Sequence, residues 1–181
     1  IGEAIARGLA ACGARVILSS RDRDSVQLVA DSITADGGEA TARACHAGRL
    51  EDIDALFGSI SNDFGRLDIL INNAATNPWY GPAAELPPAA FDKTVEVNLK
   101  GPYYMMSRAV PLMVAGGGGS IVNVASIAAM VSMSGQAVYA MTKAGLVSLT
   151  RAFAREYGQQ GVRVNAILPG VIETRLAAAL V

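Results

Sequence analysis

Short apolar runs alternate with longer helix-forming segments along almost the whole chain. The runs have the length and β-branched content of buried strands, at residues 14–19, 40–46, 67–73, 120–126 and 162–168. Helices are expected between them, at residues 3–12, 23–35, 50–64, 88–114 and 136–158. Strict alternation of strand and helix predicts parallel strands with right-handed crossovers and helices on both faces. We therefore expect the three-layer, doubly wound α/β class.

The alternation covers residues 1–181 without a linker, so a single domain is expected. The glycine run at residues 116–119 is interpreted as a helix end followed by a turn, because strand-like sequence follows at once. Hydrophobic residues make up 51% of the chain, which is enough for a substantial core and argues against disorder.

Composition and charge exclude several classes of function. The apolar runs are broken well before the roughly 18 residues that a membrane-spanning helix needs, and no leader-like segment is recognised, so a soluble protein is expected. The net charge is −1 and the 15 basic residues are scattered, which argues against nucleic-acid binding. Cys12 and Cys45 lie outside any CxxC pattern, which favours free thiols in the cytoplasm. His46 is the only histidine, so no multi-histidine metal site is expected.

Polar and turn-forming residues gather where the predicted strands end. In a doubly wound sheet, ligands bind beyond the carboxyl ends of the strands, and we expect the site on that rim. The residues at these ends are Ser19, Ser20 and Arg21, then His46, then Asn72, Asn73, Ala74 and Ala75, then Ser126, and finally Pro169 and Gly170.

Tyr139 and Lys143 stand four positions apart in the helical segment that follows Ser126. Residues i and i+4 share one face of a helix, so both polar ends can reach the same point. A nearby cation favours the phenolate and lowers the pKa of a phenol from about 10 toward neutrality, which suits a group that exchanges protons. Taken alone, such a pair is more often a surface contact, so the rest of the chain has to decide.

Several motifs together resemble those of the short-chain dehydrogenase/reductase family. They are NNAA at 72–75, where NNAG is usual, Asn98 within VNLKG, Ser126 at the end of IVNVAS, YAMTK at 139–143 and PGVIET at 169–174. Ser126 precedes Tyr139 by thirteen residues, a spacing typical of the family. More narrowly, SSR at 19–21, CHAG at 45–48 and NAATNP at 73–78 are similar to the NADP-dependent carbonyl and retinal reductases of that family. The resemblance covers essentially the whole chain and implies a Rossmann fold.

The resemblance also implies that segments of the family fold lie outside the printed chain. The family begins with a strand and a TGxxxGIG turn, of which only Ile1 and Gly2 remain, and it continues into a substrate lid and a last strand. In the strand order 3-2-1-4-5-6 the absent strand is the central one. We therefore expect the first two strands to have no neighbour that joins them to the other three.

Four catalytic residues are implied by the resemblance: Asn98, Ser126, Tyr139 and Lys143. Tyr139 would exchange a proton with the substrate oxygen, and Ser126 would hydrogen-bond the same oxygen. Lys143 would hold the nicotinamide ribose and lower the tyrosine pKa, while Asn98 would anchor a water that relays protons to the lysine. Taken singly, Ser126 is also explained as a strand-terminal hydroxyl, and Asn98 as a residue at a helix kink.

Cofactor choice depends on the end of the first predicted strand. An acidic residue there binds the ribose 2′-hydroxyl of NAD, whereas an arginine accommodates the 2′-phosphate of NADP. The position that is acidic in NAD-using relatives is Ser20 here, and Arg21 follows it, so NADP is favoured over NAD. Asp22 is the counter-argument, because a shift of one residue would bring its carboxylate near the phosphate.

Further cofactor contacts are implied along the same rim. His46 replaces an aspartate that faces the adenine in relatives, and is either an adenine-pocket residue or a histidine at the solvent edge. Trp79 and Tyr80 either line a hydrophobic substrate pocket or pack on the core. The other implied contacts are Gly2, Asn72, Ala74, Tyr139, Lys143, Pro169, Gly170, Ile172 and Thr174.

These features predict an NADP(H)-dependent oxidoreductase that transfers a hydride between the nicotinamide and a small ketone, aldehyde or secondary alcohol. A 3-oxoacyl-thioester reductase acting on acyl carrier protein uses the same catalytic set and is an alternative, as is a non-catalytic NAD(P)-binding regulatory protein. A serine hydrolase is set aside because no GxSxG elbow surrounds Ser126. The resemblance also implies a homotetramer, packed partly through the helices that contain Asn98 and Tyr139.

Overall fold

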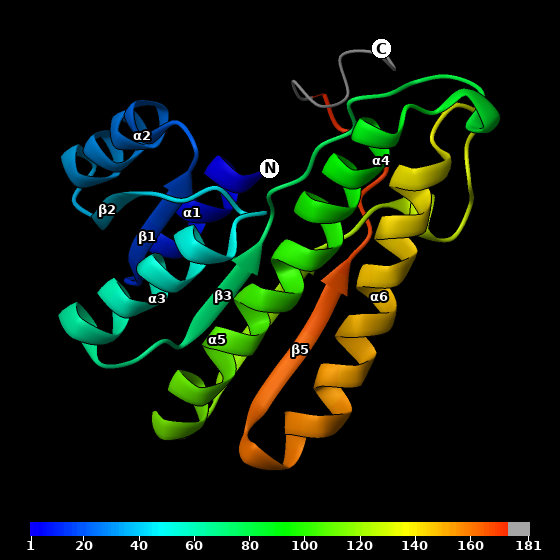
Figure 1. Cartoon of the computed structure of the whole chain (residues 1–181). Helices are drawn as coiled ribbons and strands as arrows, with labels where there is room; N and C mark the ends of the chain where they lie inside the picture. Colours follow the sequence, from blue (N-terminus) through cyan, green and yellow to red (C-terminus); the bar gives the residue numbers. More distant parts are fainter. Residues whose placement is uncertain (174–181) are drawn as a thin grey trace.

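The computed structural model describes residues 1–173, in which helices and strands alternate (Figure 1). The strands are β1 (Arg15–Ser20), β2 (Glu39–Ala44), β3 (Ile69–Asn72), β4 (Gly119–Val124) and β5 (Val162–Ile167). The α-helices are α1 (Gly2–Ala11), α2 (Arg23–Ala35), α3 (Leu50–Phe64), α4 (Pro88–Val95), α5 (Gly101–Ala115) and α6 (Ala137–Tyr157). Short 3-10 helices are η1 (Ala83–Glu85), η3 (Ile127–Ala129) and η4 (Gly158–Gln160), and η2 (Glu96–Lys100) is a π-helical turn.

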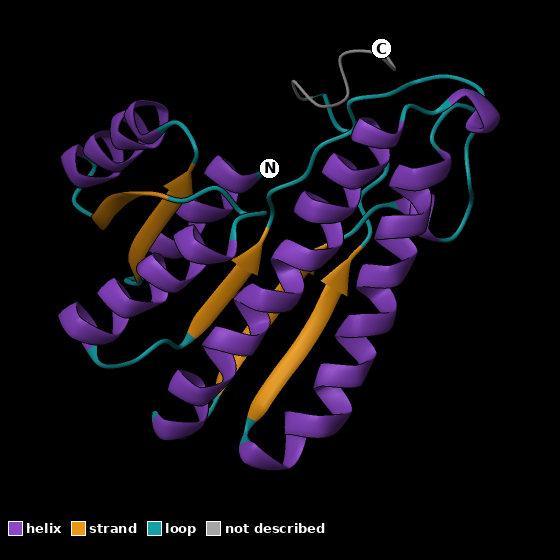
Figure 2. Ribbon diagram, in the orientation of Figure 1, coloured by secondary structure: helices purple, strands orange, loops and turns teal. Residues whose placement is uncertain are grey.

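All strand pairs in residues 1–173 are parallel, and they form two separate sheets. β1 pairs with β2, while β3, β4 and β5 follow one another in a three-stranded sheet. No ladder joins the two sheets within the described residues, as the family strand order predicts for the first two strands. The helices pack around the parallel strands (Figure 2), which confirms the predicted doubly wound α/β class.

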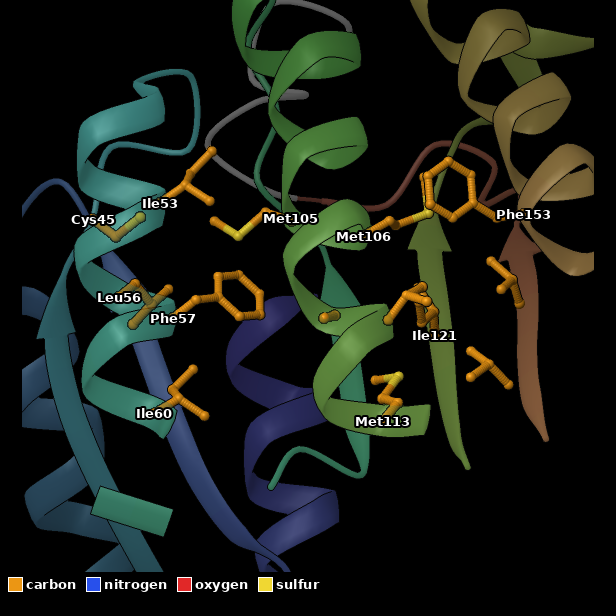
Figure 3. Packing of buried hydrophobic residues seen from close by; sticks show 14 residues of the cluster. Cys45, Ile53, Leu56, Phe57, Ile60, Met105, Met106, Met113, Ile121 and Phe153 are labelled. Atoms are coloured by element: carbon orange, nitrogen blue, oxygen red, sulfur yellow. The ribbon is translucent and has the colours of Figure 1, made fainter. Parts of the chain in front are cut away.

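The larger hydrophobic core lies between the three-stranded sheet and the helices α3, α5 and α6 (Figure 3). Ile53, Met106, Met113 and Ile121 are almost fully buried in it. A smaller cluster joins α1 and α2 to the two-stranded sheet. Because α5 and α6 are held against the sheet by this core, the start of α6 is fixed beside the carboxyl end of β4.

The helical region expected at residues 88–114 is interrupted. α4 and α5 are separated by the π-helical turn Glu96–Lys100, which contains the buried Asn98. Such turns insert one extra residue per turn and often occur at functional sites. A Cβ at Gly101 would lie 2.0 Å from the main-chain oxygen of Ala47, so only glycine lets the start of α5 pack against the loop after β2.

Candidate active site

Ser126, Tyr139 and Lys143 come together where β4 ends and α6 begins. Ser126 caps η3, its Oγ accepting a hydrogen bond from Ala128 N at 3.1 Å. The same hydroxyl is close enough to the Tyr139 phenol to lower the pKa of that phenol. Tyr139 lies in the first turn of α6 and Lys143 one turn further along. The three residues that the sequence predicted to meet therefore do so.

The electrostatic environment of Tyr139 favours the neutral phenol. Burial raises the pKa of Tyr139 above its ordinary value, the hydrogen bond from Ser126 lowers it, and the nearby Tyr80 raises it. Burial is the strongest of these influences, so the net direction is upward. Lys143 is not among these influences, so the expectation that the neighbouring lysine lowers the tyrosine pKa stays a prediction.

Lys143 is almost completely buried, with 2% of its surface exposed. Its Nζ donates a hydrogen bond to the main-chain oxygen of Val124 at 2.8 Å and lies 5.7 Å from the centre of the Tyr139 ring. Burial lowers the pKa of Lys143 from 10.5 to about 8. The ammonium therefore stands over the tyrosine ring and is anchored to the end of β4, a position from which it can support a phenolate.

Asn98 is fully buried in the π-helical turn, and its side chain is engaged by the protein itself. Its Oδ1 accepts a hydrogen bond from Thr76 N, and its Nδ2 donates to Thr76 O, both at 2.8 Å. Nδ2 also lies 3.3 Å from Thr142 Oγ1. The structure therefore shows Asn98 tying the loop after β3 to α6, and the implied role as a water anchor stays a prediction.

A basic pocket of about 410 Å³ lies beyond the ends of β1 and β2. Arg21, Arg49 and Lys93 bring three cations to its lining, and Asp52 contributes one carboxylate. Asp52 Oδ2 accepts a hydrogen bond from His46 N at 2.8 Å, which occupies part of that carboxylate. The net charge of the lining therefore favours an anion.

Asp22, the counter-argument to NADP, is not among the residues that line this pocket. It is the N-cap of α2, and its Oδ1 accepts a hydrogen bond from Ser25 N at 3.3 Å. Ser20 Oγ accepts from Asp22 N, also at 3.3 Å, and so helps to form the turn into α2. The sequence position after β1 therefore presents Arg21, and not Asp22, to the pocket.

His46 is buried in the lining of the basic pocket, so it is not a histidine at the solvent edge. Its Nδ1 accepts a hydrogen bond from Gly48 N at 3.0 Å, and its Nε2 lies 2.8 Å from Lys93 Nζ. Burial lowers the pKa of His46, as do Lys93, Arg49 and Arg21, while Glu96 opposes them. The neutral imidazole is therefore favoured, with Nδ1 as its acceptor already used by Gly48 N, and the role of His46 in an adenine pocket stays a prediction.

Two further predicted cofactor residues, Asn72 and Gly2, lie near the end of β3. The Asn72 side chain is buried and directed into the core, where its Nδ2 donates to Asn123 Oδ1 at 2.8 Å; a cofactor contact through that nitrogen is therefore not what the structure shows. A Cβ at Gly2 would lie 2.6 Å from Asn73 Nδ2, so the start of α1 closely approaches the end of β3.

The loop after β5 also reaches the rim. Pro169 O accepts a hydrogen bond from Ile127 N at 2.9 Å, which places this loop beside η3. Ala74 and Ile172 are exposed, and Gly170 lies between Pro169 and Ile172 in the same loop. Thr174 lies outside the described residues. These contacts with a cofactor stay predictions.

Several residues that sequence reasoning missed contribute to the site. Arg49 and Lys93 bring charge to the basic pocket, and Asn77 and Gln136 line a small cavity beside Tyr139, together with Trp79. Arg49 could have been predicted from the sequence, because it follows the end of β2 on the predicted rim. Lys93 lies within α4 and Gln136 is the N-cap of α6, and only the fold brings them to the site.

Within residues 1–173, no group of three or more His, Cys, Asp or Glu side chains is arranged to hold a metal ion. None of the helices in this part of the chain is long and apolar enough to cross a membrane.

A family model described as "Enoyl-(Acyl carrier protein) reductase" matches residues 1–181. The protein named dehydrogenase/reductase SDR family member 4 from Oryctolagus cuniculus is 41% identical over 180 residues, covering 99% of this chain and 69% of the relative. The human protein of that name is 38% identical, with 99% of this chain and 65% of the relative covered. A cyclohexanol dehydrogenase from an Acinetobacter strain is 36% identical over 178 residues, 98% of this chain and 71% of the relative. The chain thus spans about two thirds of the length of these relatives.

Solved structures of related proteins have the same fold. A metagenomic short-chain oxidoreductase in complex with NADP superposes with a TM-score of 0.90 at 38% identity, covering 94% of this chain and 77% of that one. A gluconate 5-dehydrogenase from Burkholderia cenocepacia J2315, in complex with NADP and tartrate, gives a TM-score of 0.94 at 27% identity, covering 99% and 70%.

Proposed function

Because the chain belongs to the short-chain dehydrogenase/reductase family, we propose that it forms the catalytic core of an NADP(H)-dependent oxidoreductase that interconverts a ketone or aldehyde and the corresponding alcohol. One observation carries this proposal: the buried ammonium of Lys143 lies over the Tyr139 ring, and the Ser126 hydroxyl is close enough to the phenol to lower its pKa. A protein that only binds a dinucleotide has no need of this arrangement.

The residues present fit NADP. Arg21, Arg49 and Lys93 would hold the 2′-phosphate, since they supply the cations of the basic pocket and the carboxylate of Asp22 is used to cap α2. His46 would face the adenine from the same lining. When bound, the reduced cofactor would supply the hydride. Two related structures contain NADP, which supports the same choice here.

The chain's own residues manage the proton and the negative charge. Reduction leaves charge on the substrate oxygen, and a neutral Tyr139 can donate its proton there. The raised pKa of Tyr139 keeps the phenol protonated near pH 7, as a general acid must be. Ser126 would donate a second hydrogen bond to the same oxygen, and Lys143 would compensate the phenolate that remains. In alcohol oxidation the same residues act in the opposite direction.

Assembly and location belong to the proposal as well. A homotetramer packed through α5 and α6 is supported by the exposure of Tyr103 on α5 and Met141 on α6. A cytoplasmic location is supported by Cys12 and Cys45, which are free thiols. The cyclohexanol dehydrogenase relative supports small carbonyl substrates, whereas the family-model name alone supports an acyl carrier protein substrate.

The test is a titration of the full-length protein with NADPH and with NADH, followed by turnover on a panel of carbonyl compounds that includes cyclohexanone and a 3-oxoacyl thioester. Trp79 is the only tryptophan, so its emission can report binding. Tighter NADPH binding and consumption of NADPH with a small ketone are expected. Binding of neither nucleotide, or binding without turnover of any carbonyl, would overturn the proposal. Turnover of the thioester alone would move the function to the acyl carrier protein alternative.

A further inference from the structure

A small cavity beside Tyr139 is formed by the loop after β3 and the start of α6. Its volume is about 10 Å³, which is room for a single group the size of an oxygen atom. Gly81 N donates a hydrogen bond to Gly135 O at 3.3 Å and so joins the two segments that surround it. Because Tyr139 also lines the cavity, a group that enters it lies next to the phenol.

Three residues that line this cavity each carry a buried side-chain nitrogen without a hydrogen-bond partner among the described residues. These atoms are Asn77 Nδ2, Trp79 Nε1 and Gln136 Nε2, three of only four such buried polar atoms in residues 1–173. Gln136 is only 4% exposed, and an indole nitrogen can only donate. Leaving a buried donor unsatisfied is unfavourable, so a cluster of three in one cavity points to an acceptor that binds there.

The donors are held in position by the surrounding backbone. A Cβ on Gly81 would lie 2.9 Å from Trp79 Cζ2, so the indole packs directly on the Gly81 backbone. Asn98 holds both polar main-chain groups of Thr76, the residue before Asn77. The cavity is therefore organised in advance of binding, which reduces the entropy lost when an acceptor enters.

We infer that this cavity is a substrate subsite that accepts a second oxygen atom of the substrate, near the carbonyl that reacts. This rests on the proposed function, because it takes Tyr139 as the proton donor. Gln136 is the N-cap of α6 and Tyr139 lies in the first turn of that helix, and both line the same small cavity. The second oxygen therefore lies within a few bonds of the reacting carbon.

The oxygen is a neutral hydroxyl or carbonyl oxygen. The described side chains that line the cavity include no cation, and a carboxylate buried without one is strongly disfavoured. The substrate class is thus an oxygenated ketone or its alcohol: a hydroxyketone, a diketone or a 3-oxo ester. A plain ketone leaves the donors unsatisfied, and sites built to hydrogen-bond a substrate oxygen discriminate against analogues that lack it.

The first test compares 2-hydroxycyclohexanone with 2-methylcyclohexanone, in which a methyl group of similar size replaces the hydroxyl. For the full-length protein with NADPH, we expect the kcat/KM for the hydroxyketone to be at least about tenfold higher than that for the methyl ketone, and this ratio measures the preference. Gln136→Leu and Trp79→Phe each remove a donor and should bring this ratio down about fivefold. Gln159→Leu, at an exposed glutamine in η4, is the matched control and should leave the ratio unchanged. A wild-type ratio near one, or a ratio that neither variant alters, overturns the subsite.

The second test needs no turnover. Trp79 is the only tryptophan, so its indole N–H gives a single signal in a nitrogen-15 NMR spectrum. With NADP present, 2-hydroxycyclohexanone should move that proton downfield and 2-methylcyclohexanone should not, and Gln136→Leu should weaken the response. An indole proton that responds to neither compound, or equally to both, means that water or nonspecific binding occupies the cavity and overturns the inference.

The two proposals fail differently. If plain ketones are reduced but the hydroxyl gives no preference and no indole shift, the subsite is wrong and the proposed function stands. If no carbonyl compound is turned over, the proposed function fails, and the indole signal still decides whether the cavity selects an oxygen acceptor.

Discussion

Asn98 holds Thr76 by two hydrogen bonds of 2.8 Å, one to its main-chain nitrogen and one to its main-chain oxygen. The two residues are 22 positions apart, so this pair fixes the loop after β3 against the π-helical turn between α4 and α5. That loop leads directly into Asn77 and Trp79, which line the cavity beside Tyr139. The position of the substrate subsite thus depends on a side chain that does not line the cavity itself.

Asn98→Ala should destabilise the protein and impair the subsite together. Both main-chain groups of Thr76 would lose their partner, and we expect the free energy of unfolding to fall by roughly 1–3 kcal/mol in urea denaturation. Asn62→Ala, at an exposed asparagine of α3, is the matched control and should change it by less than about 0.5 kcal/mol. A loss of turnover with unchanged stability would instead favour the role of Asn98 in proton relay.

Tyr139→Phe should retain NADPH binding and lose most turnover. The phenol is the only group in the proposed mechanism that transfers a proton to the substrate oxygen, and such transfers contribute about 10²- to 10⁴-fold to the rate. Tyr157→Phe, at the other end of α6, should keep turnover near the wild-type value. Steady-state kinetics and an NADPH titration of both variants provide the measurement. Turnover like that of the wild type in Tyr139→Phe would refute the assignment.

Ser126→Ala should shift the pH profile of alcohol oxidation to higher pH. Oxidation requires the phenolate form of Tyr139, and the Ser126 hydroxyl lowers the pKa of that phenol. Removing the hydroxyl leaves the effect of burial, which raises the pKa further. The rising limb of kcat/KM against pH should move upward in the variant, and kcat should fall by about 10²- to 10³-fold if the same hydroxyl stabilises the substrate oxygen. Ser148→Ala, at an exposed serine of α6, should leave the limb in place. A downward shift would contradict the assigned hydrogen bond.

Much of the fold was predictable because local signals agreed with tertiary packing. Residues 50–64 were expected to be helical, and α3 has those bounds because Ile53, Leu56, Phe57 and Ile60 repeat at helical spacing on its buried face. The helix ends at Gly65, which adopts the left-handed conformation with φ of 67° that glycine allows. The meeting of Ser126 with Tyr139 was equally predictable, from a family spacing of thirteen residues.

The parts that could not be predicted depend on contacts between distant segments. Lys93 and His46 are 47 positions apart, and nothing in either local sequence indicates that their side-chain nitrogens approach to 2.8 Å. The burial that raises the pKa of Tyr139 could not be predicted either, because an i to i+4 spacing does not reveal it. The side-chain hydrogen bond between Asn72 and Asn123 on the adjacent strand likewise has no signal in either local sequence.

Lys143 should make stability depend on pH in a defined direction. Its pKa is about 8 in the folded chain and 10.5 in the unfolded chain, so between these values only the unfolded chain holds the proton. The unfolded state then binds more protons, and stability rises with pH through this window. Below about pH 8 Lys143 is protonated in both the folded and the unfolded chain. Burial of its ammonium then lowers the free energy of unfolding by about 3 kcal/mol.

The comparison of wild type with Lys143→Met isolates this contribution. In urea denaturation, the wild type should gain about 3 kcal/mol relative to the variant between about pH 7 and about pH 10.5. Lys100→Met, at an exposed lysine of η2, serves as the control and should show no such change. A constant difference across this range would mean that the folded-state pKa of Lys143 is not lowered.

Arg21→Ala should weaken the binding of NADPH and leave the binding of NADH nearly unchanged. Arg21 lines the basic pocket, whereas the carboxylate of the next residue, Asp22, caps α2. At the end of β1 it is therefore the arginine that would contact a 2′-phosphate, which NADH lacks. Loss of a charge-assisted hydrogen bond should weaken the binding free energy of NADPH by about 1.5–3 kcal/mol. The Kd for NADPH should therefore rise roughly ten- to more than a hundredfold. Arg23→Ala, in the first turn of α2, is the matched control because Arg23 does not line the pocket. Fluorescence titration of the full-length variants with both nucleotides gives the answer, and equal losses for NADPH and NADH would show that Arg21 supports the cofactor generally and does not select it.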